Sequence, residues 1–522
     1  MKDLRSYLPI VAGEVEEIAS FLRAKTRGTL VPASGEAVAI IGSGPAGLSA
    51  AHDLALLGFR PVVFELEPVA AGMLAVGVPE YRLPRELIRR EVAVIEALGV
   101  EIRCNTKIGS DVSFRSLRQD FAAIIIAVGA KRPRALGLAG EQGPGVYGGV
   151  DFLRAVALGE ESPLGSDVVV IGGGNVAYDV ARSVVRQAAY DTARMAARLA
   201  RTRRVRLVSL ETLEEMPADT IEIREGEEEG IERVSGWGPV AIHRNERGNV
   251  TGLEIKRCLR VYDDQRRFAP QFDDDHKQIL GCDSILIAAG QAPDLAFLQD
   301  GGSDIEQFRP GWPKVDAATL MTSAKGIFVA GDLAHGTRLL IDAVASGKKA
   351  ARSVYQYVTG RPLHRETLTS FVTLEGYRRE RGYERIRRVE LPVALPEERL
   401  ENPVSQVEKR LSTDDAIREA SRCLDCGVTP VFDSSRCILC GGCADVCPTL
   451  CLKLVPASAL NPSTSLLELF EAELGEATDL ENNSAILKDE DRCIRCALCV
   501  QRCPTEAIAM ERVSFQTEWR IA

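Results

Sequence analysis

The chain has 522 residues, a formal net charge of −10 at pH 7 and a hydrophobic content of 45%. Its length predicts roughly three or four domains, and its negative charge argues against nucleic acid as a partner. The amino-terminal residues lack the apolar core of a signal peptide, and no apolar run is long enough to insert into and cross a membrane. We therefore expect a cytoplasmic protein whose 14 cysteines stay reduced.

A short cap and a nucleotide-binding motif open the chain. Residues 1–35 predict a helix from Glu14 to Arg23 and a linker. An apolar strand over 37–41 then leads into a glycine turn and a helix, and this turn contains Gly42, Gly44, Pro45, Ala46 and Gly47. In such turns the first glycine makes the bend, the second admits a pyrophosphate and the third lets helix pack on strand. A second strand ends at Glu65, placed to accept hydrogen bonds from a ribose. An ordinary βα turn is the alternative, but strand, helix and acidic residue together favour a dinucleotide site.

A second fingerprint of the same kind follows a strand over residues 167–171. Its residues are Gly172, Gly174, Asn175 and Ala177, with alanine at the third small position, as the motif permits. The next strand covers residues 205–209. Two fingerprints in one chain predict two bound dinucleotides.

Two similar segments predict how these nucleotide-binding parts are joined. A strand over 122–126 ends near Gly129, and a strand over 284–287 ends at Gly290, so each is expected to carry one crossover between a FAD domain and an inserted NAD domain. A later strand delivers Gly331 and Asp332 to a loop before a helix over 340–351. Glycine followed by aspartate is by itself only a turn signal, but in this context we expect these two residues to contact a flavin.

Two cysteine runs near the carboxyl terminus share one spacing, and proline follows the fourth cysteine of each. The runs are Cys437, Cys440, Cys443 and Cys447, then Cys493, Cys496, Cys499 and Cys503. This spacing is typical of a bacterial-type ferredoxin with two [4Fe–4S] clusters, in which the fourth cysteine of each run binds the other cluster. Cys503 is therefore assigned to the first three cysteines and Cys447 to the second three. Zinc sites are the alternative, but they need no third cysteine at this interval.

Clusters carry single electrons, whereas a nicotinamide carries a hydride. Flavin connects the two, because it accepts a hydride and releases electrons singly. We therefore assign FAD to the first fingerprint and a nicotinamide cofactor to the second.

Several residues stay outside these motifs. Cys423 and Cys426 could bind a third cluster or form a packing pair. The acidic run 222–232 is interpreted as a solvated face, and residues 466–470 as a helix with an exposed apolar side. Core positions are expected for Cys104, Cys258 and Cys282, and a loop position for His335. The NAD domain contains no CxxC pair, which argues against disulfide reductase chemistry.

Residues of about 36–360 resemble the small subunit of glutamate synthase and its relatives. The shared stretches are the first fingerprint, residues 71–79 with Tyr81, Arg82 and Leu83, residues 172–179, and residues 330–332 with 343–351. The resemblance implies that FAD lies along the first fingerprint, beside a loop that includes Gly72, Met73 and Leu74. It also implies that Asp332 binds the ribityl chain and that the next helix points its amino terminus at the flavin, where it would stabilise negative charge.

The chain departs from this family in two ways. Residues 1–35 contain no cysteine and so do not resemble the cysteine-rich domain that precedes the flavoprotein region in this family. A stretch similar to the opening of that domain, residues 419–427, lies after the flavoprotein region instead. Leu210 and Glu211 occupy the positions at which NADPH-using relatives carry an arginine pair. A carboxylate there would accept from a 2′-hydroxyl and repel a 2′-phosphate, so NADH is favoured over NADPH.

The sequence thus predicts an α/β protein with two Rossmann-like domains and a small α+β ferredoxin domain. The expected boundaries are FAD domain 36–150 and 283–360, NAD domain 151–282, a connector with the CxxC pair over 361–430, and ferredoxin domain 431–522. We expect an NADH-dependent electron-transfer subunit of a hetero-oligomeric complex, exchanging electrons with a partner enzyme or ferredoxin. Hydride would reach FAD N5 without an acid–base residue. The alternatives are a glutamate synthase small subunit serving an amidotransferase subunit, and a non-catalytic electron-wiring module.

Overall fold

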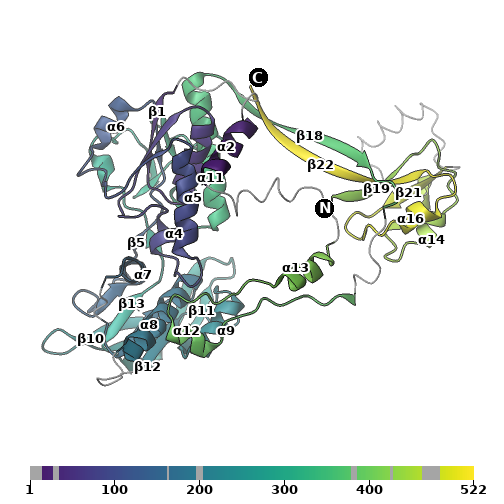
Figure 1. Ribbon diagram of the computed structural model, residues 1–522. Helices are drawn as coiled ribbons and strands as arrows, with labels where there is room; N and C mark the ends of the chain where they lie inside the picture. The colour runs from purple at the N-terminus through teal and green to yellow at the C-terminus, as the bar shows by residue number, and fades with distance from the viewer. Residues whose placement is uncertain are drawn as a thin grey trace. The chain divides into compact units, whose positions relative to one another are not determined.

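The computed structural model describes residues 15–26, 35–160, 164–194, 204–377, 385–423, 427–460 and 483–521 (Figure 1). The chain divides into two compact units. The first contains residues 1–364, 393–409 and 520–522, and the second contains residues 365–392 and 410–519. Within the described part of the chain, no helix combines the length and apolar character needed to cross a membrane.

The first unit contains a five-stranded parallel sheet with the order β17-β4-β1-β2-β3. Its strands are β1 (Ala37–Ile41), β2 (Arg60–Phe64), β3 (Glu101–Arg103), β4 (Ala123–Ile126) and β17 (Ile327–Val329). The central strands are continuous aliphatic runs because both faces of the sheet are covered. Helix α3 (Pro45–Leu56) lies against α11 (Leu340–Thr359), where Ser49 Oγ donates to the carbonyl oxygen of Val344 at 3.0 Å.

A second five-stranded parallel sheet in the same unit has the order β6-β13-β7-β8-β9. Its strands are β6 (Val146–Gly148), β7 (Asp167–Ile171), β8 (Arg204–Ser209), β9 (Glu232–Ser235) and β13 (Ser284–Ile287). Helices α7 (Gly149–Leu158), α8 (Asn175–Arg194) and α9 (Thr220–Glu228) belong to this part. An antiparallel sheet of β10 (Trp237–Arg244), β11 (Val250–Tyr262) and β12 (Phe268–Gly281) supplies the apolar side chains that cover its other face.

The two parallel sheets are linked where the chain crosses from one to the other. Strand β5 (Arg132–Pro133) on the outward crossing pairs antiparallel with β14 (Gln291–Ala292) on the return. The predicted fold class, a two-domain α/β dinucleotide-binding arrangement, is confirmed. Smaller elements complete the unit: α2 (Val15–Thr26), α4 (Met73–Val76), α5 (Arg85–Ala97), α6 (Phe114–Asp120), η2 (Ala296–Gln299), β15 (Gln307–Arg309), β16 (Trp312–Pro313), α10 (Asp332–His335) and α12 (Pro396–Glu401).

The second unit holds both cysteine runs. Strands β18 (Leu363–Thr373), β22 (Ile508–Ile521) and β19 (Val428–Phe432) form a sheet in that order, and β20 (Leu452–Pro456) pairs with β21 (Ser484–Lys488). Short helices α14 (Gly442–Asp445) and α16 (Leu498–Arg502) each contain the third cysteine of a run, η4 (Ala457–Ala459) follows β20, and α13 (Thr413–Ala420) precedes the runs. Part of the segment expected to be a connector is therefore a strand. Cys426 and residues 466–470 lie outside the described residues.

Candidate functional site

A cleft of ≈ 940 Å³ opens at the carboxyl ends of the strands of the first sheet. Parallel α/β sheets bind ligands at this end. The lining includes many of the residues that the sequence singles out: Gly42, Gly44, Pro45, Ala46, Glu65, Gly72, Met73, Leu74, Gly129, Gly331 and Asp332. These residues follow four different strands and are far apart in the chain, and the fold brings them into one cavity.

The turn after β1 is built so that only one of its glycines leaves free space. A Cβ at Gly42, whose φ is 100°, would lie 2.6 Å from the carbonyl oxygen of Ala127, and a Cβ at Gly47 would lie 1.9 Å from that of Gly42. Around Gly44 nothing lies within 4 Å of such a Cβ. Strand and helix are therefore packed against each other, and the open position at the amino terminus of α3 fits a pyrophosphate.

Glu65 lies at the end of β2 and is only 2% exposed. Its Oε2 accepts from the backbone N–H of Ser43 at 2.8 Å, its Oε1 accepts from the backbone N–H of Glu67 at 2.9 Å, and Lys131 Nζ lies 3.5 Å from Oε1. The carboxylate is thus held rigidly in the lining of the cleft. The sequence alone did not point to Ser43 or Lys131, although Ser43 stands inside the glycine turn.

The far side of the cleft comes from the loop after Gly72 and from the last part of the domain. Gly72 lies against the first turn, since its Cβ would be 2.9 Å from Gly44 Cα. Gly331 donates its N–H to Ser346 Oγ at 3.0 Å, and burial raises the pKa of the Asp332 carboxyl. Leu340 and Ala343, from the first turn of α11, also line the cleft. The amino terminus of α11 therefore faces the cavity. His335, expected in a loop, is the last residue of α10.

The glycines of the second turn have the same close and open surroundings as those of the first turn. A Cβ at Gly172, whose φ is 152°, would lie 2.6 Å from the carbonyl oxygen of Ala288, and nothing surrounds Gly174 within 4 Å. The Glu211 carboxylate lies against this turn, because its Oε2 is 2.5 Å from where a Cβ at Gly173 would be.

The remaining residues assigned to the second site lie in the same region as this turn. Asn175 Oδ1 accepts from the N–H of Asp219 at 2.8 Å, Ala177 is fully buried, and Gly290 takes a φ of 103° after β13. Val176 and Asp179, from the first turns of α8, also line the cleft of the first sheet. The second fingerprint is thus adjacent to the first cavity.

A buried group of opposite charges, which we call the Arg–Glu cluster, joins the two nucleotide-binding parts. Its members are Arg82 beside Tyr81, Asp179, Arg182 and Arg186 of α8, Glu222 and Glu225 of α9, Glu229 just after α9, and Arg399 of α12. Arg82 Nε donates to Asp179 Oδ1 at 2.5 Å, and Arg182 Nη2 lies 2.7 Å from Glu229 Oε1.

The expectation that residues 222–232 form a solvated acidic face holds for only part of the run. Glu227, Glu228 and Glu232 are exposed, but Glu222, Glu225 and Glu229 are buried against these arginines. Helix α9 and the residue that follows it present three glutamates, at intervals of three and four residues, to a helix with two arginines, and all of these side chains can be buried provided that the charges are paired. Burial raises the pKa of Asp179 to about 6, although Arg82 opposes this rise.

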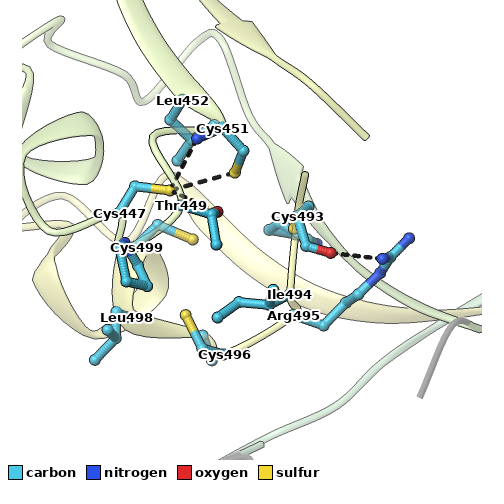
Figure 2. Close-up of a pocket in the computed structure, with 13 residues that line it drawn as sticks. Cys447, Thr449, Cys451, Leu452, Cys493, Ile494, Arg495, Cys496, Leu498 and Cys499 are labelled. Atoms are coloured by element: carbon cyan, nitrogen blue, oxygen red, sulfur yellow. Dashed lines mark hydrogen bonds between the residues drawn. The ribbon is translucent and has the colours of Figure 1, made fainter. Parts of the chain in front are cut away.

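In the second unit, thiols from both cysteine runs line one pocket (Figure 2). Cys447 comes from the first run, and Cys493, Cys496 and Cys499 come from the second. The pocket therefore combines the four cysteines that the spacing assigns to one cluster. These four thiols, beside a fifth from Cys451 that also lines the pocket, are a donor set that suits a [4Fe–4S] cluster.

The backbone of the two runs repeats as well. Residues in the left-handed region occur at matching positions: Leu439 and Arg495, Gly441 and Ala497, and Leu450 and Glu506. Non-glycine residues rarely adopt this conformation, so its repetition shows that both loops follow the same path around their cysteines. Cys423, the described member of the extra pair, is exposed.

Comparisons with known proteins agree with these two units. Residues 36–347 match the family described as pyridine nucleotide-disulphide oxidoreductase, and residues 436–507 match the 4Fe-4S dicluster domain. The NADP(+)-dependent formate dehydrogenase subunit beta of Moorella thermoacetica is 43% identical over 63% of this chain and 45% of its own length. The NADPH-Fe(3+) oxidoreductase subunit beta of Geobacter sulfurreducens is 31% identical over 76% of this chain and 62% of its own length. The chain thus spans less than two thirds of these two relatives.

Two further matches cover the flavoprotein region. The glutamate synthase [NADPH] small chain of Escherichia coli is 31% identical over 63% of this chain and 70% of its own length. The structure of Mycobacterium tuberculosis FprA in complex with NADPH superposes with a TM-score of 0.54 over 62% of this chain and 85% of that one, at 18% identity. That likeness supports the fold of the first unit.

Proposed function

The chain belongs to the pyridine nucleotide-disulphide oxidoreductase family and adds a 4Fe-4S dicluster domain, and on this premise we propose that it is an NADH-dependent electron-transfer subunit. It would pass electrons between NAD(H), FAD and two [4Fe–4S] clusters, and exchange them with a partner enzyme or ferredoxin in a larger complex. The observation that carries the proposal is the presence, in one chain, of a dinucleotide cleft and a pocket lined by thiols of both cysteine runs.

Bound FAD would accept a hydride and release its electrons one at a time. The residues that would hold it are those of the cleft. The turn at Gly44 would receive the pyrophosphate, Glu65 the ribose and Asp332 the ribityl chain. The amino terminus of α11 would favour negative charge on the flavin ring.

The residues at the end of β8 support a preference for NADH over NADPH. Glu211 lies against the turn of the second fingerprint, and Leu210, beside it, carries no charge. A carboxylate at this place accepts a hydrogen bond from a 2′-hydroxyl and repels a 2′-phosphate. The relatives reported above are named for NADP or NADPH, so this residue is where the chain would differ from them.

The family name refers to disulphide chemistry, for which residues 151–282 offer little. The cysteines of this segment are Cys258 and Cys282, far apart in sequence and both buried. Burial raises the pKa of Cys282 to about 12, whereas a reactive thiol needs a lowered pKa and access to solvent. We therefore propose that electrons leave through the clusters.

Anaerobic rapid mixing with NADH or NADPH tests this function. NADH should bleach the flavin absorbance first and the cluster absorbance afterwards, and NADPH should act much more slowly. The Cys503→Ser variant is the matched control, because it replaces a thiolate ligand of one cluster and leaves the cleft unchanged. Flavin reduction should persist in this variant, while its iron content falls and paramagnetic resonance shows damage to the cluster assigned to Cys437, Cys440 and Cys443. Flavin that stays oxidised with both nucleotides would rule out the proposal.

A glutamate synthase small subunit is the second candidate, supported by the match to the Escherichia coli protein over 342 residues. The position of the cysteine-rich part, after the flavoprotein region, argues against it. Purification of the native complex decides between the two. A bound amidotransferase subunit, with glutamate formed from glutamine and 2-oxoglutarate, would favour this candidate.

A further inference from the structure

The two cysteine runs differ at one position next to their fourth cysteine. In both runs the residue four places later donates its backbone N–H to that cysteine: Cys451 to Cys447 Sγ at 3.3 Å, and Ala507 to Cys503 Sγ at 3.2 Å. A threonine hydroxyl also lies near each sulfur, at 3.7 Å from Cys447 and 3.6 Å from Cys503. The surroundings of the two sulfurs thus match, except that one neighbour is cysteine and the other is alanine.

The side chain of Cys451 is directed at the same sulfur as its backbone. Its Sγ lies 3.3 Å from Cys447 Sγ, and it lines the pocket with Cys493, Cys496 and Cys499 (Figure 2). Cys451 is 5% exposed and Ala507 is 2% exposed, so both positions are equally shielded from water. The spacing of the motif does not call for a fifth thiol at this place.

Metal binding decides which sulfur is the donor. A cysteine that ligates iron is a thiolate and can only accept, whereas a free thiol has an S–H that can donate. In the loaded protein the contact is therefore an S–H of Cys451 pointing at the ligand sulfur of Cys447. Hydrogen bonds to cluster sulfurs are among the factors that set the reduction potential, because they stabilise the more negative, reduced state.

We propose that Cys451 raises the reduction potential of the cluster held by Cys447, Cys493, Cys496 and Cys499 above the value that this cluster would have without a donor at this position. This inference depends on the ligand sets proposed above. Ala507 offers no such donor, so the cluster bound through Cys503 lacks this stabilisation.

The test is a redox titration of the whole protein, poised with dithionite and mediators and monitored by paramagnetic resonance. Cys451→Ala makes the first run like the second at this position. It should lower the ratio of reduced to oxidised cluster at a fixed potential by up to about tenfold. This change corresponds to a midpoint potential that is lower by up to about 59 mV for a one-electron couple. One midpoint should move and the other should stay.

Two further variants separate a hydrogen bond from a general packing effect. Cys451→Ser keeps an O–H donor at the same place and should retain most of the native potential. Ala507→Cys adds the missing donor to the other run and should raise the potential of the cluster that Cys451→Ala leaves unchanged.

Results that contradict this inference differ from results that contradict the proposed function. Unchanged midpoints in Cys451→Ala would overturn the inference. A loss of about four of the about eight irons in that variant would do so as well, since Cys451 would then be a ligand. The titration uses no nicotinamide, so it is independent of whether NADH reduces the flavin. Failure of wild-type protein to be reduced by NADH would count against the proposed function and leave this result standing.

Discussion

The two nucleotide-binding parts of the first unit use the same turn in different surroundings. In both sheets the strand before the fingerprint is the central one, and in both the first glycine of the turn faces a backbone carbonyl, of Ala127 in one and Ala288 in the other. The first turn is enclosed by segments that arrive later in the chain, namely the loop after Gly72, the Asp332 segment and the start of α11. Distant segments, rather than the fingerprint alone, therefore form the walls of the cleft.

The acidic residues of the two parts also differ in how far they are enclosed by the protein. Glu65 is buried and has protein partners on both carboxylate oxygens, whereas Glu211 is half-buried against Gly173. An enclosed, rigid site suits a cofactor that stays bound, and a more accessible one suits a nucleotide that exchanges. The difference favours FAD in the first part and a dissociable nicotinamide in the second.

The largest effect is expected from Gly47→Ala. The added Cβ would lie 1.9 Å from the carbonyl oxygen of Gly42, so α3 has to move away from β1 and the turn opens. We expect purified protein to retain almost no flavin, which the absorbance ratio of flavin to protein measures. Overpacking of this kind also costs about 1–3 kcal/mol of stability. Full flavin content in a folded variant would mean that the turn does not bind the cofactor.

Replacing Leu210 and Glu211 together by arginine should change only the second part. The double variant removes a charge repulsion and adds a charge-assisted hydrogen bond, which could shift the preference from NADH towards NADPH by ~2–4 kcal/mol. Rates of flavin reduction by the two nucleotides measure the shift. Wild-type protein that already prefers NADPH would show that the 2′-phosphate is bound elsewhere.

Ala177→Gly is the mild counterpart of Gly47→Ala. It gives the second turn the glycine that the first turn has, and it should cost about 1–2 kcal/mol of stability, because a helical, fully buried methyl group is lost. Nicotinamide affinity should stay within a few-fold of wild type. Thermal unfolding and nucleotide titration check the two statements separately, and a large loss of affinity would show that the methyl group positions the nucleotide.

The smallest effect concerns pH and Asp179, where the two parts meet. Its folded-state pKa is raised to about 6, so folded protein holds the proton more tightly than the unfolded chain. Stability contributed by this group therefore falls as pH rises through about 6 and is constant above. Between about pH 5.5 and 7 the loss is about 1 kcal/mol. Asp179→Asn should remove this slope in thermal unfolding, and parallel pH curves for variant and wild type would contradict the assignment.

Local motifs in the sequence were enough to predict the fold class, because each fingerprint is a continuous strand, turn and helix. The cluster pocket was also predictable in outline, since the spacing rule pairs Cys447 with the second run. The Arg–Glu cluster was not predictable from the sequence. Charges along one helix are read as solvent-exposed unless the partners on another helix are known, and Arg182 meets Glu229 only through tertiary packing. Cys451 was visible as an extra cysteine, but its direction towards Cys447 depends on backbone conformation.

The path of the chain between the units has a practical consequence for dividing the protein. Residues 365–392 belong to the second unit, residues 393–409 return to the first, and the chain then leaves again. The returning segment carries Arg399, which is 3% exposed and lies 3.0 Å from Glu228 and 3.5 Å from Glu229. A fragment cut at residue 364 would lose this arginine and expose a buried carboxylate. The chain therefore passes from one unit to the other more than once, so neither a single protease cut nor a single gene split separates the two units as intact pieces.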